Sequence, residues 1–315
     1  YPGSPCCKGL RAMRLKIRQK MCITTWLGAA SSSAVVTMHM STLSSSQALT
    51  KIIERRQLDG CRVTFDVSED WQQGRTLYGG LIATLAIQAM RDVCGRDWPL
   101  RALQTSFIGP VLPGRFEVEV TLLRQGKNVR QVQASIRQFD TNGHTNTACV
   151  LLAVFGAGRH SVLPEVTMAY APTPKPPEQV REDAFLPAQA PTFTKHIEFR
   201  LATGGALFSG IDEIGSRTYL RMSNSDAVDA ELLSVIFSDA APPPSLARLK
   251  SAAPFSSISW ALELRPTDEV VAEGYWRIDK ETLAAADGYI NERSTLWTPD
   301  GRLAALGYQV VGVYA

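Results

Sequence analysis

Two polar residues interrupt apolar stretches of this sequence, and both carry side chains that could act on a bound water. Asp239 follows Ile236 and Phe237 at the end of an apolar run, and Gln309 lies among the small and apolar residues 303–313. A buried carboxylate can accept a proton from water, and an amide can donate to that carboxylate or accept from the water. Each also has an ordinary interpretation: Asp239 as a turn residue before prolines, and Gln309 as the partner of a buried backbone group.

A glycine pair, Gly79 and Gly80, opens an apolar segment that continues to Val93. Its apolar residues recur at helical spacing in so wide a stripe that we predict a helix buried on nearly all sides. Glycine lets another group approach the backbone closely, and the free N–H groups at a helix start can donate to an oxyanion. We therefore expect substrate to bind at Gly79 and Gly80.

Other candidate sites are weaker. Arg124 and Lys127 flank a predicted join between strands and could bind phosphate groups, although a solvated hairpin would show the same pattern. The four histidines have no metal-binding spacing, and the sequence contains neither a phosphate-binding loop nor a nucleophile-elbow serine motif. We expect neither a metal ion nor a cofactor.

The elements around these residues occur twice in the same order. A strand precedes the glycine-opened helix, and a strand at 218–223 precedes a second helix predicted over 226–241, which Asp226 or Asp229 could cap. Strands are then predicted at 103–108, 115–124, 129–139 and 145–155, and in the second half at 256–264, 270–278, 288–297 and 303–313. The turn dipeptides Asn142-Gly143 and Asp300-Gly301 join the last two strands of each half and lie 158 residues apart, which indicates duplication.

This order predicts an α+β protein in which two curved antiparallel sheets each wrap around one central helix. We divide the chain into a disordered or non-native tail (1–45), an N-terminal half (46–160), a proline-rich linker (161–191) and a C-terminal half (192–315).

The charge distribution separates the tail from the rest. The chain carries a net charge of +3, but seven basic and no acidic residues precede Glu54, which leaves the remainder at −4 and gives no sign of nucleic-acid binding. The tail could be a signal peptide, an organelle transit peptide or upstream-translated sequence, and we favour the last. With no long apolar stretch and no disulfide framework among the six cysteines, we expect a cytoplasmic protein without a membrane span.

Residues 46–60 (SQALTKIIERRQLDG), followed by LYGGLIATLAIQAM at 77–90, resemble the double-hotdog acyl-CoA thioesterases, the family of bacterial acyl-CoA thioesterase II. The resemblance extends from residue 46 to the carboxyl end. It implies a hotdog fold in each half, and hydrolysis of acyl-CoA to a free fatty acid and coenzyme A by an activated water.

The resemblance also implies which residues activate that water. The family's Asp, hydroxyl residue and Gln correspond to Asp239, Ser256 and Gln309, with Ser257 and Ser259 as near alternatives to Ser256. We also expect Ser257 to contact the substrate.

Two other functions stay open on this fold. A non-catalytic acyl-CoA-binding protein would keep a tunnel for the acyl chain and lose the polar residues Asp239, Ser256 and Gln309. A β-hydroxyacyl thioester dehydratase would need a histidine base at the central helix, where the sequence has none. We expect acyl-CoA as the small-molecule partner and a homo-oligomer as the assembly.

Overall fold

The computed structural model describes residues 47–139, 145–182, 190–223, 228–266 and 274–314. The tail predicted over 1–45 and the predicted Asn142-Gly143 turn lie outside the described residues. The described residues belong to one compact unit.

Each half contains one central helix and six strands of the main sheet. The helices are α1 (Leu49–Arg55), α2 (Gly79–Cys94) and α3 (Ala230–Ser238). The strands of the first half are β1 (Gln57–Asp59), β2 (Arg62–Val67), β5 (Leu100–Phe107), β6 (Gly114–Gln125), β7 (Val129–Phe139) and β8 (Thr145–Gly156). Those of the second half are β9 (Ile197–Thr203), β10 (Gly215–Met222), β11 (Phe255–Leu264), β12 (Trp276–Ala286), β13 (Tyr289–Trp297) and β14 (Leu303–Val313).

Shorter elements connect these strands. They are the 3-10 turns η1 (Glu69–Trp71), η2 (Pro177–Gln179), η3 (Thr192–Lys195) and η4 (Pro244–Arg248), and a small ribbon of β3 (Gln72–Gln73) and β4 (Thr76–Leu77).

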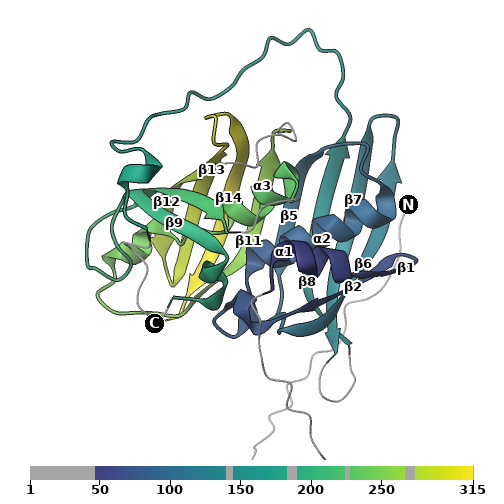
Figure 1. Ribbon diagram of the computed structural model, residues 1–315, viewed down its shortest axis with the longest axis horizontal. Coiled ribbons are helices and arrows are strands. Elements are labelled where there is room, and N and C mark those ends of the chain that lie inside the picture. Colours follow the sequence, from purple (N-terminus) through teal and green to yellow (C-terminus); the bar gives the residue numbers. More distant parts are fainter. Residues whose placement is uncertain (1–46, 140–144, 183–189, 224–227, 267–273, 315) are drawn as a thin grey trace, which may run out of the picture. The chain divides into compact units, whose positions relative to one another are not determined.

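The strand order shows the internal repeat directly. Within the described residues, 12 strands form one antiparallel sheet in the order β1-β2-β6-β7-β8-β5-β11-β14-β13-β12-β10-β9. Read from either edge, corresponding strands of the two halves follow one another in the same sequence (Figure 1). The two predicted sheets are therefore joined edge to edge, because β5 pairs with β11 through contacts such as Leu103 opposite Leu262.

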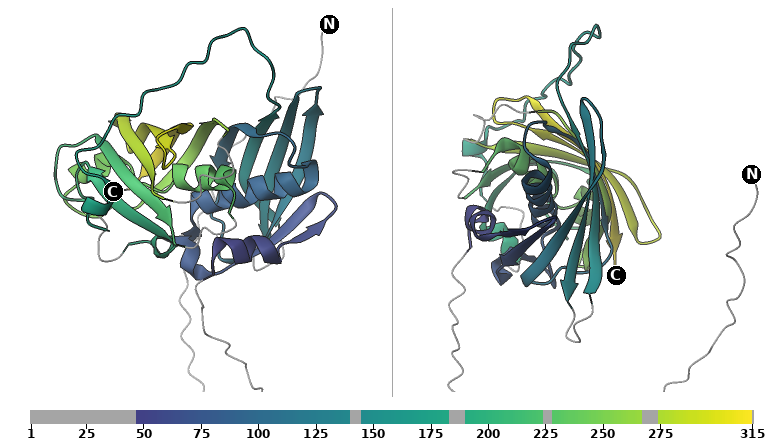
Figure 2. Two further views of the ribbon diagram at one scale, coloured as in Figure 1. Left: turned by 45° about the horizontal axis from the view of Figure 1, so that its top comes forward. Right: turned by 90° about the vertical axis from the view of Figure 1, so that its right-hand side faces the viewer.

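The sheet curves around α2, which lies along its concave side (Figure 2). Leu81, Leu85 and Ala89 are fully buried, as the wide apolar stripe of this helix predicted. The two central helices contact each other: the start of α2 meets the end of α3, where the Tyr78 hydroxyl donates to the carbonyl of Ile236. Both helices thus bury their apolar faces against one continuous sheet.

Several element boundaries differ from the predictions. The second helix is shorter than 226–241: it begins after Asp229, whose Oδ1 accepts from the N–H of Leu232 at 2.9 Å, and ends before Asp239. Strand β12 extends from Trp276 to Ala286, whereas the predicted start at Val270 lies outside the described residues. The charged residues in the centre of β12 do not show the alternation that predicts a strand. They can lie in the sheet because they form ion pairs in the folded chain. Helix α1, strand β9 and the short strands β1, β3 and β4 were not predicted.

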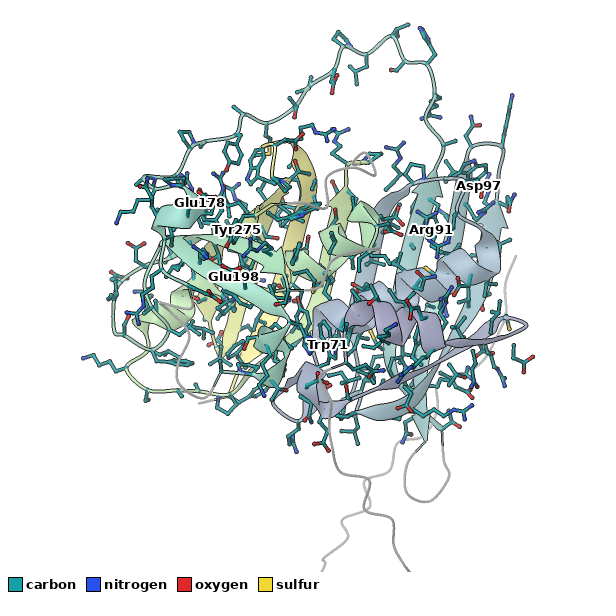
Figure 3. All side chains as sticks on the ribbon, in the orientation of Figure 1. Trp71, Arg91, Asp97, Glu178, Glu198 and Tyr275 are labelled. Carbon is teal, nitrogen blue, oxygen red and sulfur yellow. The ribbon has the colours of Figure 1, made fainter. Side chains whose placement is uncertain are left out.

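Residues 157–176 contain no helix or strand and connect β8 to η2 as a long arch (Figure 1). The C-terminal part of the arch contacts the body of the protein: the Arg277 side chain donates to the carbonyl of Ala171 at 2.7 Å. Further along, Arg200 donates to the carbonyls of Pro177 and Val180. Arg200 is itself held by Glu198, which also accepts from the Tyr275 hydroxyl at 2.5 Å (Figure 3).

Candidate active site

Three polar side chains from different elements of the second half meet at one point. The amide Nε2 of Gln309, on β14, donates to Asp239 Oδ1 at 2.8 Å and to Ser257 Oγ at 2.5 Å. Asp239 is the residue at which α3 ends, and Ser257 lies on β11 beside β14. Both N–H groups of the amide are used in this way, which leaves its carbonyl oxygen free to accept a hydrogen bond.

The first half contributes the start of α2 to the same point. The backbone N–H of Gly80 provides a hydrogen bond to the Asp239 carboxylate. A Cβ atom added at Gly79 would lie 2.8 Å from Asp239 Oδ2, and one at Gly80 would collide with the Tyr78 hydroxyl. The glycine pair is therefore required for the close approach of the Asp239 carboxylate and helix α3. Helix N-termini favour a negative charge of this kind. The predicted approach of a substrate to these glycines stays a prediction.

Burial is the main influence on the ionisation of Asp239. Desolvation raises the pKa of this carboxyl to about 6, against the opposing effects of the Lys280 charge and of the hydrogen bond from Gln309. The nearby Glu292 carboxylate raises the pKa further, and the Gly80 N–H lowers it. A carboxyl with a pKa of about 6 is ionised at neutral pH and can still accept a proton during a reaction.

The structure separates the three candidate serines and brings Ser257, not Ser256, to Gln309. Ser256 is exposed, and its Oγ lies 3.2 Å from the Tyr314 hydroxyl, away from Asp239. Neighbouring residues of a strand point to opposite faces, so Ser257 faces inward with Gln309. A β-bulge between Ser257 and Ser259 then resets the alternation, which turns Trp260 inward and leaves Ser259 outside the cluster.

A cavity of about 480 Å³ adjoins the cluster, a size within the usual range for small-molecule sites. Asp239, Ser257 and Gln309 form part of its wall. Most of the remaining wall is apolar and comes from Phe193, Phe199, Leu207, Phe208, Phe255 and Val311. An apolar cavity that borders a carboxylate, an amide and a hydroxyl can hold an apolar chain with its reacting group beside those polar atoms.

The other predicted substrate-binding residues do not line this cavity. Arg124 and Lys127 are exposed at the join between β6 and β7. Gly79 and Gly80 lie next to Asp239 but are not among the residues that line the cavity. The nearby Arg130, by contrast, is buried against the ring of Trp98.

A buried ion pair beside the cluster was not anticipated. Lys280 Nζ lies 2.5 Å from Glu292 Oε1 and donates to the carbonyl of Ala241, two residues beyond Asp239, at 2.8 Å. Both side chains border the cavity, and Glu292 is paired directly opposite Gln309 across β13 and β14. With correct boundaries for β12, alternation would have placed Lys280 on the same inward face as Trp276 and Ile278.

Metal binding and membrane insertion have no structural support in the residues described. No group of three or more His, Cys, Asp or Glu side chains among them could hold a metal ion. None of the helices in the same part of the chain is both long and apolar enough to cross a membrane.

Comparison with known protein families matches both halves separately. Residues 67–156 match the acyl-CoA thioesterase N-terminal domain, and residues 173–313 match the acyl-CoA thioesterase C-terminal domain. The chain belongs to the acyl-CoA thioesterase family. The predicted family resemblance is thus confirmed.

Solved structures show the fold of this thioesterase-family protein. A conserved hot dog protein of unknown function from Alicyclobacillus acidocaldarius is 20% identical with a TM-score of 0.74, over 84% of this chain and 97% of that one. A putative thioesterase II from Thermobifida fusca is 18% identical with a TM-score of 0.70, over 85% and 97%. An acyl-CoA thioesterase II, TesB2, from Mycobacterium marinum is 15% identical with a TM-score of 0.64, over 85% and 99%. The predicted double hotdog fold is confirmed, and among curated protein sequences none matches significantly.

Proposed function

We propose that this protein hydrolyses acyl-CoA thioesters to a free fatty acid and coenzyme A. The observation that carries the proposal is the hydrogen-bonded cluster at Gln309. Its amide donates to both the Asp239 carboxylate and the Ser257 hydroxyl at the wall of an apolar cavity. Membership of the acyl-CoA thioesterase family supports the same substrate class.

In the proposed mechanism Asp239 is the general base. Its carboxylate accepts a proton from a water that the carbonyl oxygen of Gln309 also holds, and the water oxygen attacks the thioester carbonyl carbon. The carbon–sulfur bond of the resulting tetrahedral species breaks, and the thiolate of coenzyme A leaves and takes up a proton. No described residue accepts a hydrogen bond from Ser257 Oγ, so its hydroxyl hydrogen is available to the developing oxyanion.

Ser257 thereby takes the role expected of Ser256. Gly79 and Gly80 act indirectly in this proposal, because they bring the N-terminus of α2 to the carboxylate. The dehydratase alternative has less support, since no histidine is among the described residues that line the cavity. His196 lies elsewhere, stacked on Trp71 and paired with Asp70 at 2.9 Å.

The test is release of free thiol from a series of acyl-CoA substrates, from butyryl-CoA to palmitoyl-CoA, by the wild-type protein and by Asp239→Asn. Loss of a positioned general base typically lowers turnover by a factor of about 100 to 10,000, and we expect a loss of that size. Wild-type turnover in the variant would exclude Asp239 as the base. Binding of acyl-CoA without thiol release by the wild-type protein would favour a non-catalytic binding protein.

Thermal melting of the same variant provides the folding control. Because burial raises the pKa of Asp239, the charged form destabilises the native state at pH values above about 6. Asparagine keeps the size and the acceptor for Gln309 without the charge. We therefore expect the melting temperature of Asp239→Asn at pH 8 to equal or exceed that of the wild type.

A further inference from the structure

The cavity is closed on one side by a loop that only the second half possesses. In the first half, β1 and β2 are joined by a two-residue turn at Gly60 and Cys61. The corresponding strands β9 and β10 are joined by residues 204–214. The half that contains Asp239, Ser257 and Gln309 thus carries an insertion where its duplicate has a tight turn.

This insertion is held in place rather than free. The backbone N–H of Phe208 donates to the carbonyl of Leu246 at 3.1 Å, and that of Ile211 donates to the carbonyl of Ala247 at 3.0 Å. The N–H of Gly210 donates to Leu249 at 2.9 Å. These bonds tie the loop to η4 and make it a fixed part of the cavity wall.

Phe208 has an unusual backbone conformation within the loop. Its φ angle is 57°, in the left-handed region that residues with a side chain rarely adopt. Strain of this kind persists only where the surroundings enforce it, and it often occurs at functional sites. In this loop the strained conformation accompanies a phenyl ring that borders the cavity.

The position of Phe208 relative to the reacting group follows from β14. Gln309 and Val311 lie on the same inward face, two residues and therefore about 7 Å apart along the strand. Val311 belongs to a small apolar cluster with Leu246 and Ile290, against which Leu207 and Phe208 pack. The cavity therefore has a polar end at Gln309 and an apolar end at Phe208.

We infer that loop 204–214 is the end wall of the acyl site and that Phe208 limits the length of the acyl chain the protein accepts. The inference rests on the proposed hydrolysis of acyl-CoA. An acyl chain whose carbonyl lies beside Asp239 and Gln309 would run along the inward face of β14 past Val311 and end against the phenyl ring. Phe208 would then determine specificity without taking part in the chemistry.

The experiment compares kcat/KM for octanoyl-CoA and palmitoyl-CoA in the wild type, Phe208→Ala and Phe208→Trp. Each buried methylene contributes about fourfold in binding, so room for several more carbons should raise the palmitoyl-to-octanoyl ratio at least tenfold in Phe208→Ala. Phe208→Trp should lower the ratio. Alanine and phenylalanine both carry a Cβ atom and disfavour the left-handed conformation to a similar degree. The substitution therefore removes the ring without changing the backbone preference at this position.

Leu283→Ala is the matched control, since this half-exposed apolar residue of β12 does not line the cavity, and we expect it to keep the wild-type ratio. An unchanged ratio in both Phe208 variants would overturn the inference while leaving hydrolysis itself established. An equal loss of kcat/KM for both substrates would also overturn it, because it would place the ring against coenzyme A instead of the acyl chain. Absence of thiol release from the wild type would instead contradict the proposed function. If Phe208→Ala has a much lower melting temperature than the wild type, the palmitoyl-to-octanoyl ratio of Phe208→Trp still tests whether Phe208 limits chain length.

Discussion

At the scale of single residues, the amide of Gln309 determines which serine can take part in catalysis. It donates to Ser257 Oγ and to Asp239, whereas Ser256 contacts Tyr314 on the opposite face of β11. A hydroxyl aimed at a developing oxyanion contributes to the transition state more than to the bound substrate. The two neighbouring serines therefore form a natural pair of test and control positions.

We expect Ser257→Ala to lower kcat by about ten- to a thousandfold, because one oxyanion-hole donor is typically worth up to about a thousandfold. Steady-state thiol release measures this loss. Ser256→Ala should keep the wild-type kcat, since its hydroxyl lies outside the cluster. The reverse result, with Ser256→Ala impaired and Ser257→Ala active, would restore the original choice of serine.

The raised pKa of Asp239 predicts the pH dependence of the reaction. The carboxylate must be ionised to act as base, so kcat/KM should be constant above about pH 7 and decline as the pH falls through about 6. The charged groups that influence the pKa of Asp239 are Lys280 and Glu292. Burial, followed by the charge of Asp239, raises the pKa of the Tyr78 hydroxyl well above its ordinary value. Lys280 favours the ionised form of Asp239, and Glu292 opposes it.

A pH–rate profile of thiol release measures this decline in kcat/KM at low pH. Melting curves of the wild type across the same pH range show whether the protein stays folded. A profile that stays flat down to pH 4.5, close to the ordinary pKa of an aspartate, would contradict the assignment of Asp239 as a buried base.

At the scale of secondary-structure elements, the site depends on two helix ends that meet. Helix α3 ends at Ser238, with Asp239 as its C-cap, and α2 begins at Gly79, so the partial positive charge of one helix start faces the carboxylate at the other helix end. Only a glycine pair permits this approach. The Tyr78 ring, which stacks on Phe193 with ring centroids 4.1 Å apart, holds the junction together.

Gly80→Ala should therefore be destabilising. The new methyl group would meet the Tyr78 hydroxyl and would lie 2.8 Å from the carbonyl oxygen of Ile236, and overpacking of this kind costs about 1–3 kcal/mol. We expect a lower melting temperature and a loss of activity, because Asp239 must move with α3. Denaturant unfolding and thiol release measure the two effects.

Gly109→Ala is the control for this substitution, since no atom of the described residues, apart from its own chain neighbours, lies within 4 Å of a Cβ added there. Equal stability of both alanine variants would show that α2 and α3 do not approach as closely as described.

At the scale of the whole molecule, the two helix junctions of the duplicated fold have diverged. At the end of α2 opposite the candidate site, Arg91 (Figure 3) is buried and donates to Glu231 Oε1 at 2.8 Å. The residue 158 positions before Gln309 is Leu151, which is fully buried. Among the described residues, the opposite junction thus holds an ion pair, and the first-half counterpart of Gln309 is apolar.

The continuous sheet also predicts that neither half functions alone. Separating residues 46–160 from 192–315 would expose β5 and β11 as bare edges and would remove Gly80 from Asp239. We expect each half to aggregate or remain unfolded when expressed singly, and coexpression to restore some thiol release. Size-exclusion chromatography and melting curves provide the measurement. A monomeric, cooperatively folded second half with full activity would contradict this dependence.

The sequence by itself determined the repeat, the buried helix α2 and most strands of the sheet. These features follow from hydrophobic periodicity and turn residues, which are local properties of the chain. Asp239 and Gln309 were assigned through the family resemblance, and their positions at the end of an apolar run and within one supported that assignment. The strands that escaped prediction are the short β1, β3 and β4, together with β9 and most of β12, and in β12 the central charges gain partners only after folding.

Only the tertiary structure decided which residues meet. A one-residue bulge in β11 determines the face on which each serine lies, and local pattern does not reveal such a bulge. The approach of Gly80 to Asp239 and the Phe208 wall each join segments that are distant in the sequence. The Lys280–Glu292 pair joins neighbouring strands, but its burial depends on the helix and cavity above them. Such contacts are a property of the packed chain that no single segment contains.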